Sequence, residues 1–246
     1  MRKLQIKEFG TAGSGKTRLN RTMVVSMRFL LQSLRLALDE RTAQEGNESH
    51  HMAKDLCLFL QHVGLQDVIT DLNLESVKLE AEQVSTLWSR LKHFSQGAQI
   101  RLTAYTGVAS TLLGFGATTV CSLFKTGTTN FKETLDGPLA VELQSGNGLA
   151  FAVLILADEV SFIGGSLLGK MELRGRQGRT QWLEEANIDS DDEHSVGGNM
   201  GWVFSGDPSQ LPPVNDKELI SKQKPETKLE RRGKDFWDNV PHVIQF

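Results

Sequence analysis

Short apolar segments, each followed by glycine or polar residues, recur along this chain of 246 residues. Residues 4–9, 99–105, 151–157 and 202–205 are segments of this kind and are predicted to be strands. Near-continuous apolar strands are typical of a parallel sheet that is buried on both faces. The pattern therefore predicts an α/β fold, a parallel sheet flanked by helices, in which ligands bind at the carboxyl ends of the strands.

Helical periodicity is found in two regions. After the first predicted strand, apolar residues recur every three or four positions between Leu19 and Leu38, which predicts an amphipathic helix that begins near Lys16. Residues 39–97 change in character, with a polar stretch followed by two helical patterns. We interpret them as a helical insertion in the α/β domain.

Two polar segments interrupt the second half of the chain. Residues 175–198 have little periodicity and are expected to form a surface loop. The highly charged residues 217–232 are also expected to be exposed. A short helix and a last strand that reaches Phe246 are expected to follow them.

The composition excludes several classes of protein. With 39% hydrophobic residues and a net charge of -3, the chain is neither disordered nor a binder of nucleic acid through charge alone. Its apolar runs are shorter than the roughly 18 residues of a membrane span, so no transmembrane segment is expected. Two cysteines and the lack of a signal-peptide pattern indicate a reducing, intracellular setting.

Residues 10–17 fit the phosphate-loop pattern G-x-x-x-x-G-K-[ST] and lie between a predicted strand and a predicted helix. Their order is Gly10, Thr11, Ala12, Gly13, Ser14, Gly15, Lys16 and Thr17. In this pattern glycines let backbone N–H groups surround phosphates, the lysine reaches the β and γ phosphates, and the threonine hydroxyl binds Mg²⁺. We therefore expect residues 10–17 to bind ATP and Mg²⁺.

Two other polar motifs also follow predicted strands. Asp158 and Glu159 come directly after residues 151–157, where the first carboxylate would hold Mg²⁺ and the second would act as general base toward the attacking water. A solvated turn or a helix cap is the alternative for an acidic pair taken alone. Gln210 lies in the proline-rich residues 205–213, where its amide would bind the γ phosphate and water. A proline-stabilised turn is the alternative there.

Together these motifs resemble those of superfamily 1 DNA helicases, and within them the Pif-type family. The resemblance covers most of the chain in family order: residues 10–17 as motif I, 102–110 as motif Ia, 116–124 as the next segment, 156–162 as motif II and 206–214 as motif III. It implies a RecA-like P-loop NTPase fold. It also implies ATP hydrolysis coupled to 5′–3′ translocation on single-stranded DNA and to unwinding of forked or duplex DNA, in DNA repair and recombination.

The resemblance also implies roles for individual residues. Lys16 would bind phosphates, Thr17 and Asp158 would hold Mg²⁺, Glu159 would be the general base, and Gln210 would sense the γ phosphate. Contacts with the DNA backbone are implied for Thr106, Gly107, Thr119 and Ser122, since hydroxyl and N–H groups bind phosphates without reading sequence. For Thr119 and Ser122, a buried or capping hydroxyl is the alternative.

Three features depart from the family pattern. Tyr105 stands where a proline is usual and either stacks on a base or packs beneath its loop, and Cys121 stands where a histidine is usual. The chain starts on the first strand and ends at Phe246. Residues 1–246 are therefore expected to be the first motor domain alone, without the second motor domain and with weak or no unwinding. A non-catalytic nucleotide- or DNA-binding remnant of a mobile-element helicase is the alternative. An intracellular location is expected, and the sequence does not distinguish the nucleus from the mitochondrion.

Overall fold

The computed structural model describes residues 5–11, 15–26, 28, 99–127, 131–181 and 193–245. The chain divides into two compact units, one comprising residues 2–23 with 99–246 and the other residue 1 with 24–98. Only residues 24–26 and 28 of the second unit are described, so the predicted insertion at 39–97 lies outside the described residues.

Among the described residues, six strands form one sheet in the order β3-β2-β4-β5-β1-β6, and every neighbouring pair is parallel. The strands are β1 (Gln5–Phe9), β2 (Gln99–Ala104), β3 (Thr118–Thr119), β4 (Ala152–Asp158), β5 (Gly201–Gly206) and β6 (His242–Gln245). The helical segments are α4 (Gly107–Leu113), α5 (Val120–Phe124), α6 (Gly137–Leu143), η2 (Val160–Phe162), α7 (Gly165–Gly178), η3 (Glu193–Asn199) and α9 (Lys228–Asp238). Residues 16–26 are also helical.

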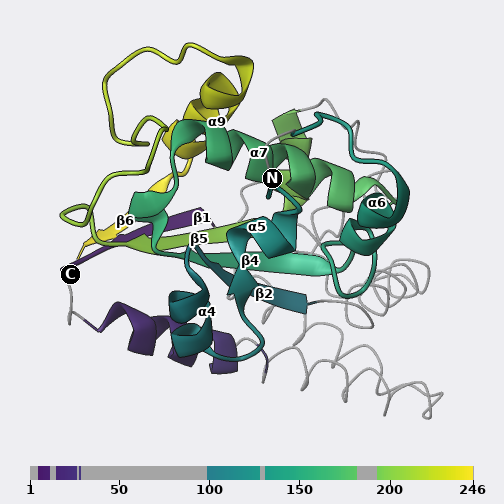
Figure 1. The fold of residues 1–246 in the computed structure, drawn as a ribbon. Helices are drawn as coiled ribbons and strands as arrows, with labels where there is room; N and C mark the ends of the chain where they lie inside the picture. The colour runs from purple at the N-terminus through teal and green to yellow at the C-terminus, as the bar shows by residue number, and fades with distance from the viewer. Residues whose placement is uncertain are drawn as a thin grey trace, which may run out of the picture. The chain divides into compact units, whose positions relative to one another are not determined.

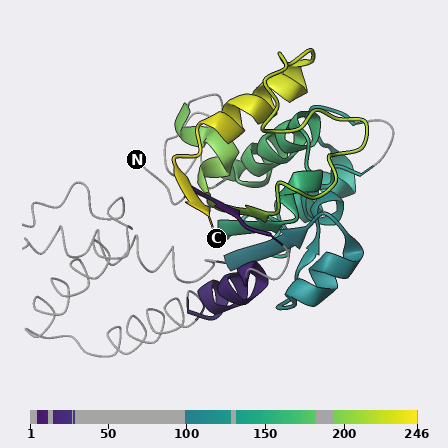
Figure 2. The same ribbon diagram turned by 90° about the vertical axis from the view of Figure 1, so that its left-hand side faces the viewer.

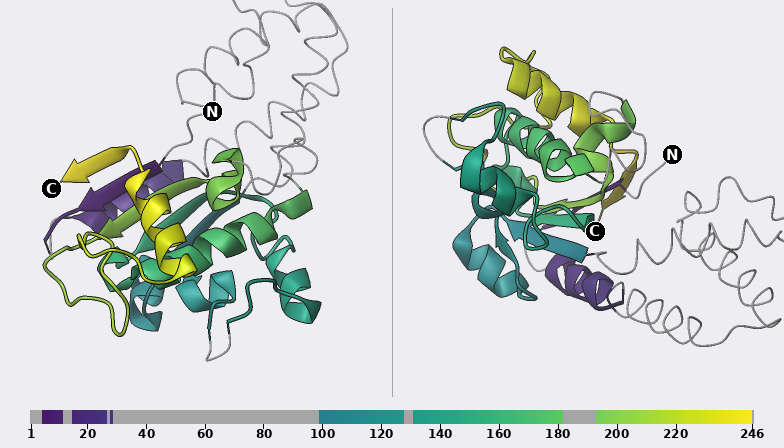
Figure 3. Two further views of the ribbon diagram at one scale, coloured as in Figure 1. Left: turned by 90° about the horizontal axis from the view of Figure 1, so that it is seen from above. Right: turned by 90° about the vertical axis from the view of Figure 1, so that its right-hand side faces the viewer.

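Helices cover both faces of the sheet, as expected for an α/β fold. α5, α7 and α9 lie over one face, whereas α4 and the helix that starts at Lys16 lie on the other (Figure 1; Figure 2). Viewed from above, α7 and α9 lie side by side across the strands (Figure 3). This arrangement confirms the predicted fold class.

An aromatic cluster forms the core between the sheet and α7 and α9. Trp202 and Phe204 alternate with smaller residues along β5 and point to the same face, because side chains of a strand alternate between its two faces. The Trp202 ring lies 5.6 Å from that of Phe124 and 5.2 Å from that of Phe236, measured between ring centroids. Burial of these large rings fixes the position of β5, which precedes the Gln210 loop.

Two expectations about polar segments need correction. The predicted surface loop at 175–198 is wrong at its start, because residues 175–178 are the last turn of α7, and Gly175 and Gly178 are buried. At its other end Gly197 and Gly198 are also buried, while residues 182–192 lie outside the described part of the chain. Residues 217–232 are exposed or half-buried as expected, apart from Leu219, but the helix expected after them begins earlier, at Lys228 in α9. In the described ranges the longest helices are too short and too polar to cross a bilayer.

Candidate nucleotide site

The predicted motifs meet at one edge of the sheet because β4, β5 and β1 are neighbouring parallel strands. Phe9 and Gly206, which end β1 and β5, are partners in the register, and the Gly10 N–H donates to the Gly206 carbonyl at 3.3 Å. Asp158 ends β4 at the same level, opposite Ala104 of β2. The turns after these strands therefore face one another across a short distance.

A cavity of about 370 Å³ lies between these turns. This volume falls within the range of small-ligand sites. The cavity is lined by Gly15, Lys16, Thr17, Ala109, Leu112, Leu113, Asp158, Glu159, Gly206, Asp207 and Gln210. Lys16, Thr17, Asp158, Glu159 and Gln210 are thus brought together, whereas Gly10 and Thr11 of the predicted phosphate loop do not line the cavity. Of the predicted phosphate loop, Ala12, Gly13 and Ser14 lie outside the described residues.

Lys16 contacts the start of its own loop. Its Nζ atom donates hydrogen bonds to the backbone carbonyls of Gly10 and Thr11, the second at 2.9 Å. The ammonium group therefore lies beside the residues that directly follow β1. This is the position that a phosphate-binding lysine needs, because an anion held by the loop would lie against it.

Asp158 and Glu159 lie at the end of β4, where the backbone of Glu159 has an unusual conformation. Glu159 has φ 57° and ψ 39°, a left-handed conformation that costs a non-glycine residue about 1 kcal/mol or more. An Asp158 Oδ1 atom accepts a hydrogen bond from the Glu159 N–H at 2.9 Å. Burial raises the pKa of Asp158, and the Lys16 charge partly opposes this effect. A divalent cation at Asp158 would offset the same desolvation, so the residue fits the proposed metal.

Gln210 is placed by one contact from the motif that contains Asp158 and Glu159 and by a turn within its own motif. The Ser161 hydroxyl, one turn beyond Glu159, donates to Gln210 Oε1 at 3.2 Å. Asp207 Oδ1 accepts from the Ser209 N–H at 2.9 Å, which closes the turn that leads to Gln210. A Cβ at Gly206 would lie 2.7 Å from Val160 Cγ1, so only glycine lets the two motifs approach this closely.

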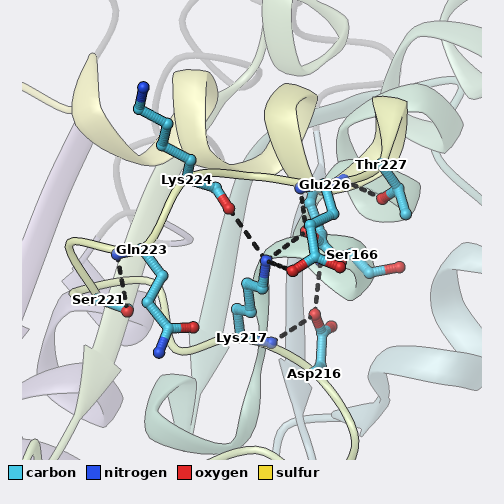
Figure 4. Close-up of polar contacts among 9 residues, drawn as sticks. Ser166, Asp216, Lys217, Ser221, Gln223, Lys224, Glu226 and Thr227 are labelled. Atoms are coloured by element: carbon cyan, nitrogen blue, oxygen red, sulfur yellow. Dashed lines mark hydrogen bonds and ion pairs between the residues drawn. The ribbon is translucent and has the colours of Figure 1, made fainter.

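The loop that carries Gln210 is anchored farther along by Asp216 and Lys217 (Figure 4). The Asp216 carboxylate accepts from the backbone N–H groups of Ser166 and Leu167, both at 3.0 Å, at the first turn of α7. Lys217 Nζ reaches Glu226 at 2.7 Å, just ahead of α9. These contacts fix the far end of the loop to both helices, although the sequence motif ends before Asp216.

Glu8 is a buried acid that the sequence analysis did not single out. It is completely buried on β1, in register with Ser205 of β5, and neither carboxylate oxygen has a hydrogen-bond partner within the described residues. Burial, and secondly the charge of Asp158, raises the pKa of Glu8 to about 7. A carboxylate in the middle of a strand of a buried sheet is the sequence signal that could have identified it.

This pKa gives a prediction about stability. Between about pH 5 and 7 the folded protein retains the Glu8 proton that the unfolded chain loses, so the free energy of unfolding falls as the pH rises through this interval. We expect a decrease of roughly 2 kcal/mol between pH 5 and pH 8 in urea denaturation. Glu8→Gln should flatten this dependence, leaving a smaller contribution from Asp158. An unchanged slope in the variant would contradict the prediction.

The residues expected to contact DNA follow β2 and β3. Thr106 and Gly107 begin α4, and Thr119 ends β3 opposite Ala104, so they lie at the same edge of the sheet as the cavity. The Thr119 hydroxyl accepts from the Ser122 N–H at 3.3 Å and caps α5, which confirms the capping role. Contact with DNA stays a prediction for all four residues, Thr106, Gly107, Thr119 and Ser122.

Tyr105 packs beneath its loop. Its ring lies stacked on Phe162 with centroids 5.5 Å apart, and it contacts the hydrophobic core. Of the two alternatives for this residue, packing is therefore the one observed. Cys121 is exposed on the first turn of α5.

A six-stranded parallel sheet with helices on both faces and a phosphate-loop pattern after β1 defines a RecA-like P-loop domain. Comparison with solved structures agrees. The Pif1 helicase from Candida albicans matches 98% of this chain and 36% of its own chain, with a TM-score of 0.50 and 16% identity. Bacteroides Pif1 bound to single-stranded DNA matches 99% of this chain and 38% of its own, with a TM-score of 0.45 and 18% identity.

The likeness to the Candida albicans protein shows that this chain has the fold of part of that protein. This chain spans little more than a third of the length of that protein. Another similar structure is that of a Bacteroides Pif1 helicase in complex with ADP-AlF3 and single-stranded DNA. The match covers 99% of this chain and 38% of the Bacteroides chain, with a TM-score of 0.45 and 18% identity. No family profile matches the sequence, and no curated protein matches it.

Proposed function

We propose that this chain is the first motor domain of an ATP-dependent DNA helicase of the Pif type, which moves 5′ to 3′ on single-stranded DNA. The observation that supports this proposal best is the convergence of Lys16, Thr17, Asp158, Glu159 and Gln210 on one cavity at the carboxyl ends of the strands. These residues come from three separate sequence motifs. A shared cavity is what joint action on one nucleotide requires.

In this proposal Mg²⁺, when bound with ATP, neutralises charge on the phosphates and is held by Thr17 and Asp158. Lys16 binds the β and γ phosphates. Glu159 accepts a proton from the attacking water, and Gln210 orients that water and the γ phosphate through its amide. Thr106, Gly107, Thr119 and Ser122 bind the backbone of single-stranded DNA at the same edge of the sheet.

Steady-state ATP hydrolysis, with and without single-stranded DNA, tests the proposal. We expect slow hydrolysis by the chain alone, because in such motors an arginine from a second motor domain stabilises the transferred phosphate, with an effect of about 10³ to 10⁵ on rate. Lys16→Ala and Glu159→Gln should each reduce the rate by about 100-fold or more. Glu142→Gln is the matched control, because Glu142 is an exposed carboxylate on α6, away from the cavity.

The outcomes separate the two functions considered. A rate that both substitutions reduce and single-stranded DNA raises would support the motor. Binding of nucleotide without turnover, even after a second motor domain is supplied, would favour the non-catalytic remnant. Hydrolysis that survives Lys16→Ala would contradict the proposed site.

A further inference from the structure

Thr106 makes two hydrogen bonds with Glu159, the proposed general base. Its backbone N–H donates to Glu159 Oε2 at 3.1 Å, and its hydroxyl donates to the same oxygen at 2.9 Å. The two residues follow neighbouring strands, β2 and β4, whose ends are aligned by the pairing of Ala104 with Asp158. Both donors of Thr106 are therefore directed at one carboxylate oxygen.

These contacts turn the Glu159 carboxylate toward the start of α4. Hydrogen bonds to a charged group are stronger than those between neutral groups, so two of them on one oxygen define a preferred orientation. In this orientation Glu159 Oε2 has two donors, which leaves fewer lone pairs of the carboxylate for the water that a general base must contact. The left-handed backbone of Glu159 places the side chain in this arrangement at the expense of local strain.

The same two donors are those that a DNA phosphate would use. A threonine hydroxyl carries one proton, and a backbone amide carries one. Neither proton can serve a phosphate oxygen and Glu159 fully at the same time. The hydrogen bond that caps α4 does not enter this competition. In it the Thr106 hydroxyl accepts from the Ala109 N–H at 3.1 Å, so the hydroxyl proton remains available to Glu159 or to a phosphate.

We propose that Thr106 is a positioning residue that holds Glu159 in a resting orientation, and that single-stranded DNA releases Glu159 by taking over the Thr106 donors. The inference rests on the proposed function and adds how DNA would regulate hydrolysis. Because Glu159 and DNA compete for the same protons, the coupling is reciprocal. Loss of the Glu159 carboxylate must then make single-stranded DNA bind more tightly.

The experiment is fluorescence anisotropy of a labelled oligothymidine titrated with the chain, without nucleotide. Glu159→Ala should lower the Kd at least about 5-fold, the lower end of typical coupling between sites. Glu159→Gln, whose neutral amide can still accept from Thr106, should have a smaller effect. Asp158→Ala is the matched control, because it removes a carboxylate one residue earlier, and within the described residues Asp158 forms no hydrogen bond with Thr106.

Measurement at two salt concentrations isolates the hydrogen bonds from long-range charge, which salt screens. Tighter binding by Glu159→Ala than by Asp158→Ala at both concentrations would support the inference. Equal binding by the two variants would overturn it while leaving the DNA interface intact. No binding by the wild-type chain would instead refute the proposed DNA interface, and the inference with it. Thermal denaturation confirms that each variant is folded.

Discussion

Gly169→Ala is expected to lower the free energy of unfolding by about 3 kcal/mol. Gly169 is buried on α7, and a Cβ at this position would overlap the backbone carbonyl oxygen of Leu229 on α9. A backbone carbonyl cannot turn aside as a flexible side chain can, so the two helices would have to separate. Because α7 follows the motif with Asp158 and Glu159, the displacement should also weaken the nucleotide site.

Gly165→Ala is the matched control for this prediction. Gly165 lies one turn earlier on the same buried face of α7, and a Cβ there would lie 3.5 Å from the nearest atom, the Glu230 carbonyl oxygen. This is an ordinary contact, and alanine favours helix over glycine by up to about 1 kcal/mol. Urea denaturation should therefore show little change or a gain for Gly165→Ala. Equal destabilisation by both substitutions would show that close helix packing is not the cause.

β4 and β5 were predictable from the sequence because their apolar runs are nearly continuous, whereas β3 is two threonines long and was not predicted. α7 was not predictable, because its buried face includes four glycines and the charged residues Glu172 and Arg174, which are each 1% exposed. An apolar pattern cannot reveal a helix that packs through glycines, which have no side chain, and through buried ion pairs. For the same reason Gly175, in close contact with Gly197, was assigned to a loop.

The candidate site was predictable only in part. The phosphate loop and the Asp158–Glu159 pair follow their strands directly, so the α/β rule places them at one edge. The contact of Thr106 with Glu159 depends on the register of β2 against β4, and strand register between distant segments is not encoded in a local pattern. Glu8 was missed because its role depends on what surrounds it in the folded chain.

Glu172→Ala is the second substitution with a large expected effect, about 3 kcal/mol of lost stability. The Glu172 carboxylate is buried and accepts from Arg176 Nε at 2.5 Å, from an Arg232 nitrogen at 2.7 Å and from the Gly197 N–H at 3.0 Å. It thus joins α7, α9 and η3. Its removal takes one acceptor from each guanidinium group and takes the Glu172 acceptor from the buried Gly197 N–H. Removal of one partner of a buried ion pair typically costs 3–5 kcal/mol.

Partial exposure of Arg176 and Arg232, 15% and 28%, lets both side chains reach water and keeps the expected loss at the lower end of that range. Glu172→Gln should lose less, because the amide oxygen can still accept from Gly197. Glu142→Ala is the matched control, in which the carboxylate that is removed is exposed instead of buried. Glu142 forms a 2.7 Å ion pair with Lys125 but is 57% exposed. Exposed pairs contribute about 1 kcal/mol or less. If urea denaturation gave the same loss for Glu142→Ala and Glu172→Ala, burial would not be what makes the Glu172 contacts important.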